Sequence, residues 1–190
     1  MDVTIGGAAD YNAAATRGAW HSICDPTLQF AHPELVKLLA LWRANAGDEG
    51  IPLRRVMSAR LLRSLVRDIA IYERVATAGG GRRYRVRLIG TGFAHIVGDL
   101  TGRFIDEAIG TDFVARWHGA LDATLGANAP LRFVGREDTN NMIFLTGEFL
   151  SAPLAADDGQ VNLVLGSARY SGKRPWPEVE AETRDRLGLD

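Results

Sequence analysis

The residues Arg83-Tyr84-Arg85-Val86-Arg87-Leu88 form the most regular stretch of this sequence. Apolar side chains alternate with arginines, and a period of two residues is typical of a β-strand. Such a strand has one apolar face and one face that carries three guanidinium groups. It therefore fits an antiparallel sheet with one buried face, and the arginines Arg83, Arg85 and Arg87 are predicted to form a polar contact surface.

The segments on either side of this strand show a definite order of helical and strand-like periods. A strand over 68–75 and a triple-glycine turn precede it, the glycine-rich region 90–110 allows only short helices, and a long helix is predicted over 112–125. Three further strands are predicted over 131–136, 142–154 and 161–170. The turns between them have hairpin length, so the strands are expected to be antiparallel. This order predicts an α+β fold with one antiparallel sheet and helices on one face.

A leading helix is predicted over 33–46, because Pro33 suits a first helical position. Its apolar stripe is long enough to pack on a sheet or on a second subunit, and consists of Leu35, Leu38, Leu39 and Trp42. A short helix over 59–66 is expected to begin after an N-cap at Ser58.

Three regions follow from this reading of the chain. Residues 1–32 lack sustained periodicity and are predicted to be a loosely ordered N-terminal arm. Residues 33–172 hold the predicted domain with its leading helix. Residues 173–190 are predicted to be a C-terminal tail with a short acidic helix.

The order of elements and several local motifs resemble a known family. The motifs are Leu41-Trp42-Arg43, Ile51-Pro52-Leu53-Arg54, Tyr84-Arg85-Val86-Arg87-Leu88-Ile89-Gly90-Thr91, Gly98-Asp99-Leu100-Thr101-Gly102-Arg103, and Gly147-Glu148-Phe149-Leu150 followed by Pro153-Leu154. In this respect the chain is similar to a single-domain PAS subfamily that is common in alphaproteobacteria. The resemblance implies a five-stranded antiparallel sheet around a pocket, in a sensory or protein-interaction module that acts through a partner and commonly forms a homodimer.

Nine residues are predicted to face inward at the position of that pocket: Tyr84, Val86, Leu88, His95, Trp117, His118, Leu121, Phe133 and Phe144. They would line either a pocket for a small apolar ligand or a filled core, and the sequence leaves both alternatives open. No cofactor is the first expectation. Haem is the alternative, with His118 on the long helix as the iron ligand and His95 as a second candidate.

Other site chemistries find less support. The only cysteine, Cys24, lies ahead of the predicted fold, which argues against a flavin photosensor with a reactive thiol and against a multi-cysteine zinc site. No nucleophile elbow of the type Gly-x-Ser-x-Gly and no His-Glu-x-x-His motif is present. The chain is therefore expected not to be an enzyme. The alternative is a small isomerase or dehydratase on a related cone-shaped fold, with site candidates Asp106, Asp112, His95 and His118.

Charge and hydropathy complete the expectations. The chain has 22 basic and 23 acidic residues and a net charge of −1, which makes nucleic-acid binding an improbable function. An arginine-rich group around the predicted short helix fits either a solvated face or an anionic partner, and consists of Arg54, Arg55, Arg60, Arg63 and Arg67. No segment reaches the ~18 apolar residues of a membrane span, so no membrane association and a cytoplasmic location are expected.

Overall fold

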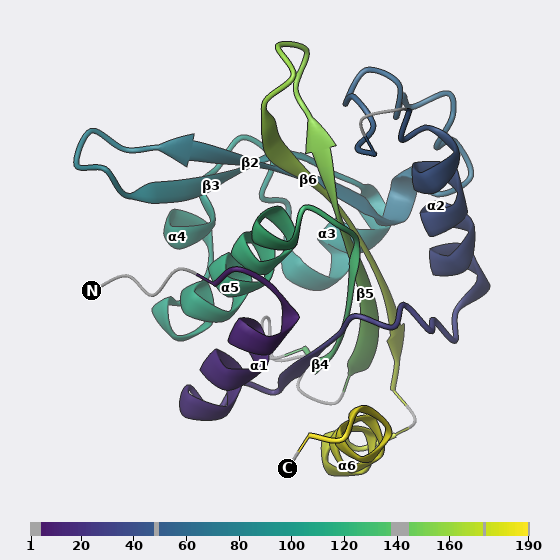
Figure 1. Cartoon of the computed structure of the whole chain (residues 1–190), viewed down its shortest axis with the longest axis vertical. Helices are drawn as coiled ribbons and strands as arrows, with labels where there is room; N and C mark the ends of the chain where they lie inside the picture. Colours follow the sequence, from purple (N-terminus) through teal and green to yellow (C-terminus); the bar gives the residue numbers. More distant parts are fainter. Residues whose placement is uncertain (1–4, 48–49, 138–144, 173, 190) are drawn as a thin grey trace.

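The computed structural model describes residues 5–47, 50–137, 145–172 and 174–189 (Figure 1). Its helices are α1 (Ala8–Arg17), α2 (Pro33–Ala44), the 3₁₀ turn η1 (Val66–Asp68), α3 (Thr91–Val97), α4 (Ile105–Ala108), α5 (Thr111–Ala127) and α6 (Trp176–Leu187). Its strands are β1 (Ser22–Asp25), β2 (Ile69–Ala76), β3 (Arg82–Ile89), β4 (Leu131–Arg136), β5 (Thr146–Ala155) and β6 (Val161–Ser171). The predicted α+β class with one antiparallel sheet is confirmed.

The sheet has six strands in the order β1-β4-β5-β6-β2-β3, and the neighbours pair antiparallel. Five strands were expected. The sixth strand, β1, comes from the N-terminal arm and pairs with β4, so that Cys24 lies opposite Phe133. The predicted meander of β4, β5 and β6 forms the centre of the sheet.

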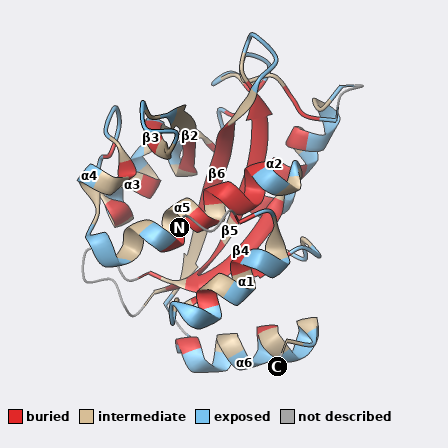
Figure 2. Cartoon of the chain, turned by 60° about the vertical axis from the view of Figure 1, so that its left-hand side comes forward, coloured by how far each residue is buried: buried red, intermediate tan, exposed pale blue. Residues whose placement is uncertain are grey.

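Helices cover both faces of this sheet, so the prediction of helices on one face is wrong. The side chains of Leu150 and Leu165 on β5 and β6 pack on the α2 side, whereas those of Phe149 and Val164 pack on the α5 side. All residues of β5 except Phe149 are buried, as are the middle six residues of β6 (Figure 2). Because β5 carries apolar residues at both odd and even positions, each face needs its own cover.

The apolar stripe of α2 packs on its own sheet. Leu35, Leu38, Leu39 and Trp42 are 0–5% exposed and belong to one cluster with β5 and β6. The Trp42 indole nitrogen donates a hydrogen bond to the Pro153 carbonyl oxygen over 2.8 Å. The stripe is therefore used inside the subunit, and its predicted alternative role as an interaction surface is wrong.

The segment between α2 and β2 forms a series of turns rather than the predicted helix over 59–66. The Leu62 amide still reaches the Ser58 carbonyl over 3.0 Å, but the Leu65 amide then bonds to the Leu62 carbonyl over 2.7 Å, which is a tighter turn. Met57, Leu62 and Leu65 are nevertheless buried under α2. Burial of these side chains, and not helix propensity, determines the path of the segment.

The described part of the N-terminal arm, residues 5–32, forms α1 and β1, so the prediction of a loosely ordered arm is wrong. Tyr11 on α1 is 1% exposed and stacks edge-on against Phe133, with ring centroids 4.9 Å apart. The Asn12 side chain donates to the Cys24 carbonyl oxygen over 2.9 Å and accepts from the Cys24 amide over 2.7 Å. These two bonds satisfy the backbone of an edge strand, whose outer groups would otherwise have no partner.

The arm also approaches α5 closely. A Cβ atom at Gly126 would lie 2.8 Å from the Gly6 Cα atom. This distance excludes any residue larger than glycine at position 126 of α5. Glycine at this position therefore lets the two backbones come into contact.

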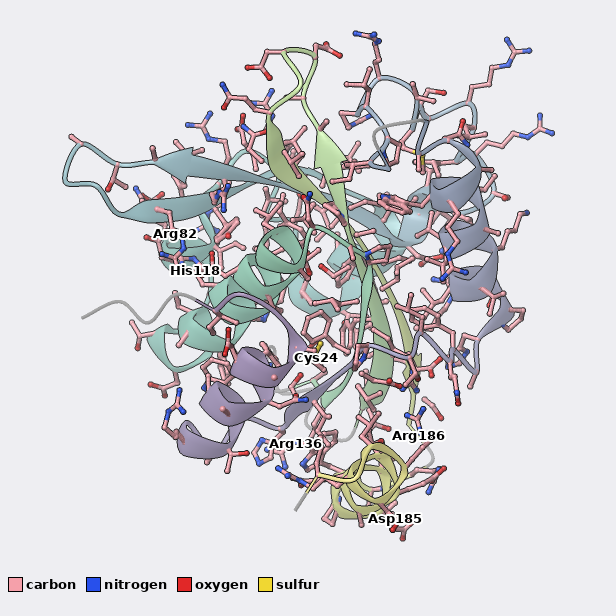
Figure 3. All side chains as sticks on the ribbon, in the orientation of Figure 1. Cys24, Arg82, His118, Arg136, Asp185 and Arg186 are labelled. Atoms are coloured by element: carbon pink, nitrogen blue, oxygen red, sulfur yellow. The ribbon has the colours of Figure 1, made fainter. Side chains whose placement is uncertain are left out.

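The C-terminal helix α6 packs against β1 and β4 on the α2 side of the sheet. Trp176 forms a small apolar cluster with Ile23 and Val134. At the other end of α6, the Arg186 guanidinium reaches the Asp25 carboxylate over 2.8 Å (Figure 3). The predicted acidic helix over 178–187 is thus confirmed as a helix, and it is docked on the domain rather than a separate tail.

The bonds from Asn12 to β1 lead to the first prediction. Replacement of Asn12 by alanine should lower the free energy of unfolding by about 1–3 kcal/mol, because two hydrogen bonds to the edge strand are lost. Urea denaturation of the two proteins measures this difference. Arg17→Ala, at an exposed position of the same helix, is the matched control and should change stability by less than about 0.5 kcal/mol. Equal effects of the two substitutions would contradict the capping role of Asn12.

Candidate functional site: a cavity between α5 and the sheet

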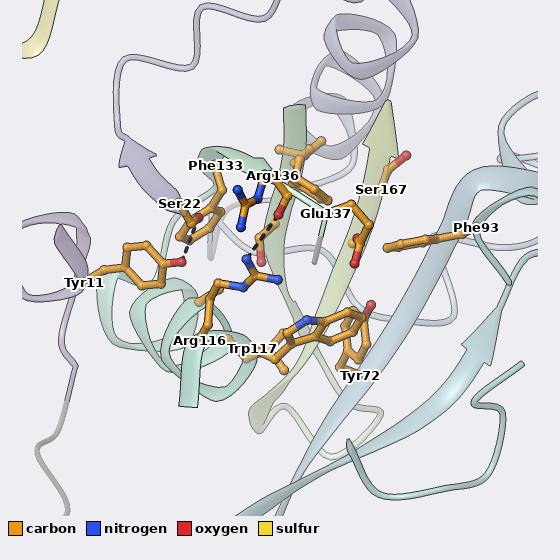
Figure 4. Close-up of a pocket in the computed structure, with 17 residues that line it drawn as sticks. Tyr11, Ser22, Tyr72, Phe93, Arg116, Trp117, Phe133, Arg136, Glu137 and Ser167 are labelled. Carbon is orange, nitrogen blue, oxygen red and sulfur yellow. Dashed lines mark hydrogen bonds between the residues drawn. The ribbon is translucent and has the colours of Figure 1, made fainter. Parts of the chain in front are cut away.

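A cavity of about 110 Å³ lies between α5 and the inner face of the sheet (Figure 4). Its lining comes from the long helix, from five strands and from α1 and α3, and consists of Tyr11, Ser22, Tyr72, Phe93, Arg116, Trp117, Ala120, Leu121, Phe133, Gly135, Arg136, Glu137, Phe149, Leu150, Ser151, Gly166 and Ser167. On α5, positions three and four residues apart face the sheet together.

Large aromatic side chains form the walls of the cavity, and small residues leave the space open. Trp117 meets Tyr72 edge-on, with ring centroids 6.1 Å apart. A Cβ atom at Gly166 would lie 2.9 Å from the Tyr72 ring, so a larger residue there would push this ring. The cavity therefore exists because Gly166 and Ala120 stand where bulky apolar residues would fill a closed core.

Charged groups gather at one end of the cavity and are held by partners. Arg116 donates to the Arg136 carbonyl oxygen over 3.1 Å, and the Arg136 guanidinium lies 2.8 Å from the His21 ring nitrogen. Glu137 is 3% exposed and accepts a hydrogen bond from the Tyr170 hydroxyl over 3.2 Å. This end forms a polar rim, whereas the opposite walls are apolar.

Two tyrosine hydroxyls also reach the cavity. The Tyr11 hydroxyl donates to the Ser22 hydroxyl over 2.9 Å. Among the described residues, the Tyr72 hydroxyl has no hydrogen-bond partner, and burial together with the nearby Glu137 carboxylate raises the pKa of Tyr72. Tyr72 therefore offers a neutral hydroxyl, able to donate and accept, to whatever enters the cavity.

Three of the predicted pocket residues line this cavity: Trp117, Leu121 and Phe133. Tyr84 and Val86 are fully buried in the adjoining core but do not reach the cavity. Phe144 lies outside the described residues.

Leu88 points to the other side of the sheet, so its assignment to the pocket is wrong. In the register of β2 and β3, Tyr72 pairs with Val86 and the next residue, Ile71, pairs with Leu88. Arg87 is thus an extra residue in β3, and a bulge of this kind reverses the facing of the residues after it. Leu88 packs with the α2-side cluster instead.

Neither histidine candidate lines the cavity. His95 is exposed on α3. The His118 ring packs beside the Tyr84 ring, with centroids 5.2 Å apart, and its buried Nε2 atom finds no hydrogen-bond partner in the described part of the chain. Burial lowers the pKa of His118, which favours a neutral ring. As an iron ligand in this cavity His118 is misplaced, and about 110 Å³ is far below the ~300–1,000 Å³ of sites for larger ligands.

His118 instead lies beside a buried polar cluster on α5 and β3. The Asp122 carboxylate accepts two hydrogen bonds from the Arg82 guanidinium, each of 2.6 Å, and one of 2.5 Å from the Tyr84 hydroxyl. Figure 3 shows Arg82 and His118 near one another at this corner of the molecule. These three hydrogen bonds to Asp122 hold β3 against α5.

The enzyme candidates do not converge on the cavity. Asp106 is held by the Arg83 guanidinium over 2.8 Å, and this hydrogen bond keeps the pKa of Asp106 below its usual value. Asp112 is exposed at the start of α5. Within the described residues, no group of three or more His, Cys, Asp or Glu side chains could hold a metal ion. The absence of enzymatic activity remains a prediction.

The arginines of β3 are largely engaged within the domain. Arg83 also pairs with Glu107, over 2.5 Å, and its guanidinium lies 3.9 Å from the Phe104 ring centroid. Arg87 pairs with Glu73 over 3.3 Å, and Arg85 stacks over Phe104 at 4.8 Å. These contacts hold α4 and the edge strand together, so they weaken the prediction of a free contact surface on β3.

Several lining residues escaped the sequence reading. Ser22 and Tyr11 lie in the arm that was expected to be loose, and Arg136 is the last residue of β4, with Glu137 directly after it. Ala120 had a detectable signal, since it lies three residues after Trp117 on α5, and Arg116 lies four residues before Ala120.

The sheet, the covering long helix and the cavity between them define a class of small α+β domains. A family model described as the PAS domain matches residues 30–169, well over half of the chain. The chain belongs to the PAS domain family. The narrower resemblance to one subfamily stays a prediction, and no curated protein matches the chain.

The chain also matches solved structures at low identity. An RNA-binding light-oxygen-voltage receptor has a TM-score of 0.46 and 11% identity over 89% of this chain, which spans 45% of that receptor. A sensory box sensor histidine kinase from Vibrio cholerae has a TM-score of 0.40 and 15% identity, with 75% of this chain and 97% of that one covered. A sensory box histidine kinase/response regulator from Burkholderia thailandensis E264 has a TM-score of 0.37 and 20% identity, with 68% and 95% covered.

No helix in the described part of the chain is both long and apolar enough to cross a membrane.

The four tyrosines of the chain lead to the second prediction. Burial raises the pKa of each of them, and they are Tyr11, Tyr72, Tyr84 and Tyr170. A phenol with a raised folded-state pKa contributes stability below its unfolded value of about 10, and this stability is lost as the pH rises above it.

In an alkaline titration, phenolate absorbance should therefore stay low until the domain unfolds, and should then rise together with the loss of circular dichroism. A tyrosine that ionises near pH ~10 in the folded domain would contradict this environment.

Proposed function

We propose that this PAS domain is a non-enzymatic sensory module that binds a small, largely apolar molecule in the cavity and acts on a protein partner. The observation that carries the proposal is the cavity of about 110 Å³ that the fold leaves open beneath α5. A core filled by side chains would have no such space. A ligand between Trp117 of α5 and Phe133 of β4 would contact both the helix and the sheet. Its binding would favour one relative position of α5 and the sheet.

The size of the cavity limits the ligand to a single ring or a short chain. An apolar cavity of about 150 Å³ is known to hold benzene, which is close to the 110 Å³ observed here. Haem and flavin are much larger than this. The Tyr72 hydroxyl adds one polar contact, so a ring that carries one hydrogen-bonding group fits best, and phenol is the simplest molecule of this kind.

The third prediction tests the cavity by filling it. Saturation-transfer NMR with phenol and benzene as probes should show binding to the wild-type domain. Ala120→Leu places an isobutyl group in the cavity and should weaken both affinities at least ~10-fold. Ala115→Leu makes the same change at an exposed position of α5 and should leave both unchanged. Absence of binding to the wild type, or equal losses in the two variants, would overturn the proposal.

The fourth prediction concerns the polar contact within the same site. Tyr72→Phe removes one hydroxyl and should weaken phenol binding roughly 2- to 10-fold, which is the value of one hydrogen bond. Benzene forms no such bond, so its affinity should not fall. Loss of affinity for both probes would show that the substitution alters the cavity rather than one contact.

A homodimer is a separate part of the proposal. It is supported by the resemblance to the PAS subfamily, whose members commonly form homodimers. Because the α2 stripe is buried, an interface has to use another surface. Light scattering of the purified domain is expected to give twice the mass of the chain. A monomer mass at high protein concentration would contradict the homodimer.

A further inference from the structure

The arginines of this chain fall into two groups according to their partners. Arg82, Arg83 and Arg132 form short ion pairs with aspartates of neighbouring elements. By contrast, Arg60, Arg63 and Arg67 are exposed, and within the described residues they form no ion pair or side-chain hydrogen bond. We call these three residues the arginine flank. Asp68, the acidic residue next to them in the chain, is already bound by Arg169 over 3.0 Å.

The backbone segment that carries the arginine flank is held in place by buried side chains and by a hydrogen bond to α2. Leu62 and Leu65, which alternate with the flank arginines along the chain, are 4% and 3% exposed and are buried under α2. The Lys37 ammonium of α2 donates to the Ser64 hydroxyl over 3.0 Å, which ties the helix to this segment. The arginines therefore project from a fixed support, and nitrogen-tipped side chains extend outward on the α2 side of the molecule (Figure 3).

Exposed aliphatic side chains occur on the same side. Among the described residues, the large hydrophobic side chains with substantial exposure are Val36 on α2 and Val56 in the segment before the flank, at 49% and 40%. Both valines belong to elements that the Lys37–Ser64 hydrogen bond ties together, and a surface that exposes both aliphatic and guanidinium groups is suited to binding a protein partner. The net charge of −1 conceals this local excess of positive charge.

We propose that the arginine flank is a docking surface for an acidic protein segment that carries aliphatic side chains. Carboxylates pair with guanidinium groups in a planar, bidentate manner, and aliphatic side chains of the same segment would cover Val36 and Val56. The inference rests on the proposed function in one respect, since it names the chemistry of the partner on which the sensory module acts. A nucleic acid fits less well, because the net charge of the chain is −1.

The fifth prediction uses a fluorescein-labelled peptide that alternates glutamate and leucine. Fluorescence anisotropy should show binding to the wild-type domain that weakens with added salt. Arg60→Glu, Arg63→Glu and Arg67→Glu in one variant should weaken it at least ~10-fold. The control variant makes the same changes at Arg17, Arg87 and Arg103, which are also exposed, and should keep the affinity within about twofold.

The outcomes separate this inference from the cavity proposal. Circular dichroism confirms that both triple variants are folded, and Ala120→Leu, which fills the cavity, should still bind the peptide. Equal losses in the two triple variants would show a nonspecific charge effect and overturn the inference. No binding by the wild type, or tighter binding of a single-stranded RNA of equal charge, would overturn it as well.

Discussion

The buried guanidinium of Arg132 determines how the peripheral segments attach to the sheet. It binds the Asp25 carboxylate of β1 over 2.6 Å, and its Nε atom donates to Glu148 of β5 over 3.0 Å. Glu148 extends the network, since its carboxylate also accepts hydrogen bonds from the backbone amides of Ala31 and His32 just before α2. Asp25 in turn binds Arg186 of α6. One cation thus fixes the edge strand, the start of α2 and the end of α6. Loss of one partner of such a buried pair costs about 3–5 kcal/mol, because an unpaired charge remains.

The ionisation of Asp25 agrees with this role. Burial by itself raises the pKa of Asp25, but hydrogen bonds from Thr27 and Arg186 and the charge of Arg132 outweigh it and lower the pKa below its usual value. The charged form is therefore the stable one in the folded domain, and the network weakens only as the pH falls towards this lowered value. At neutral pH its charges are paired, so the network contributes rigidity.

The sequence predicted those parts of the fold that depend on local periodicity. The alternation in β3, the strand over 131–136 and the stripe of α2 all appear where expected, because each is encoded within one element. The arm escaped prediction because its order depends on distant partners: Asn12 completes the backbone of Cys24, and Tyr11 packs on Phe133. Only some of the residues that line the cavity were predicted, because the facing of a helical residue also depends on distant partners. A rotation of one residue on α5 separates Trp117, which lines it, from His118, which does not, and only the packed sheet decides between them.

The boundaries of the family match add a final point about the cavity. The matched region, 30–169, supplies Trp117, Phe133 and most of the lining, but Tyr11 and Ser22 come from the preceding arm. Their mutual hydrogen bond places a polar group on a wall that the PAS domain alone leaves incomplete. Because the arm is held by β1, and β1 by Arg132, the shape of the cavity depends on the buried charge network on the opposite face of the sheet. The Arg132 network and the cavity are therefore connected through β1. A ligand that displaced Tyr11 would also affect the packing of β1.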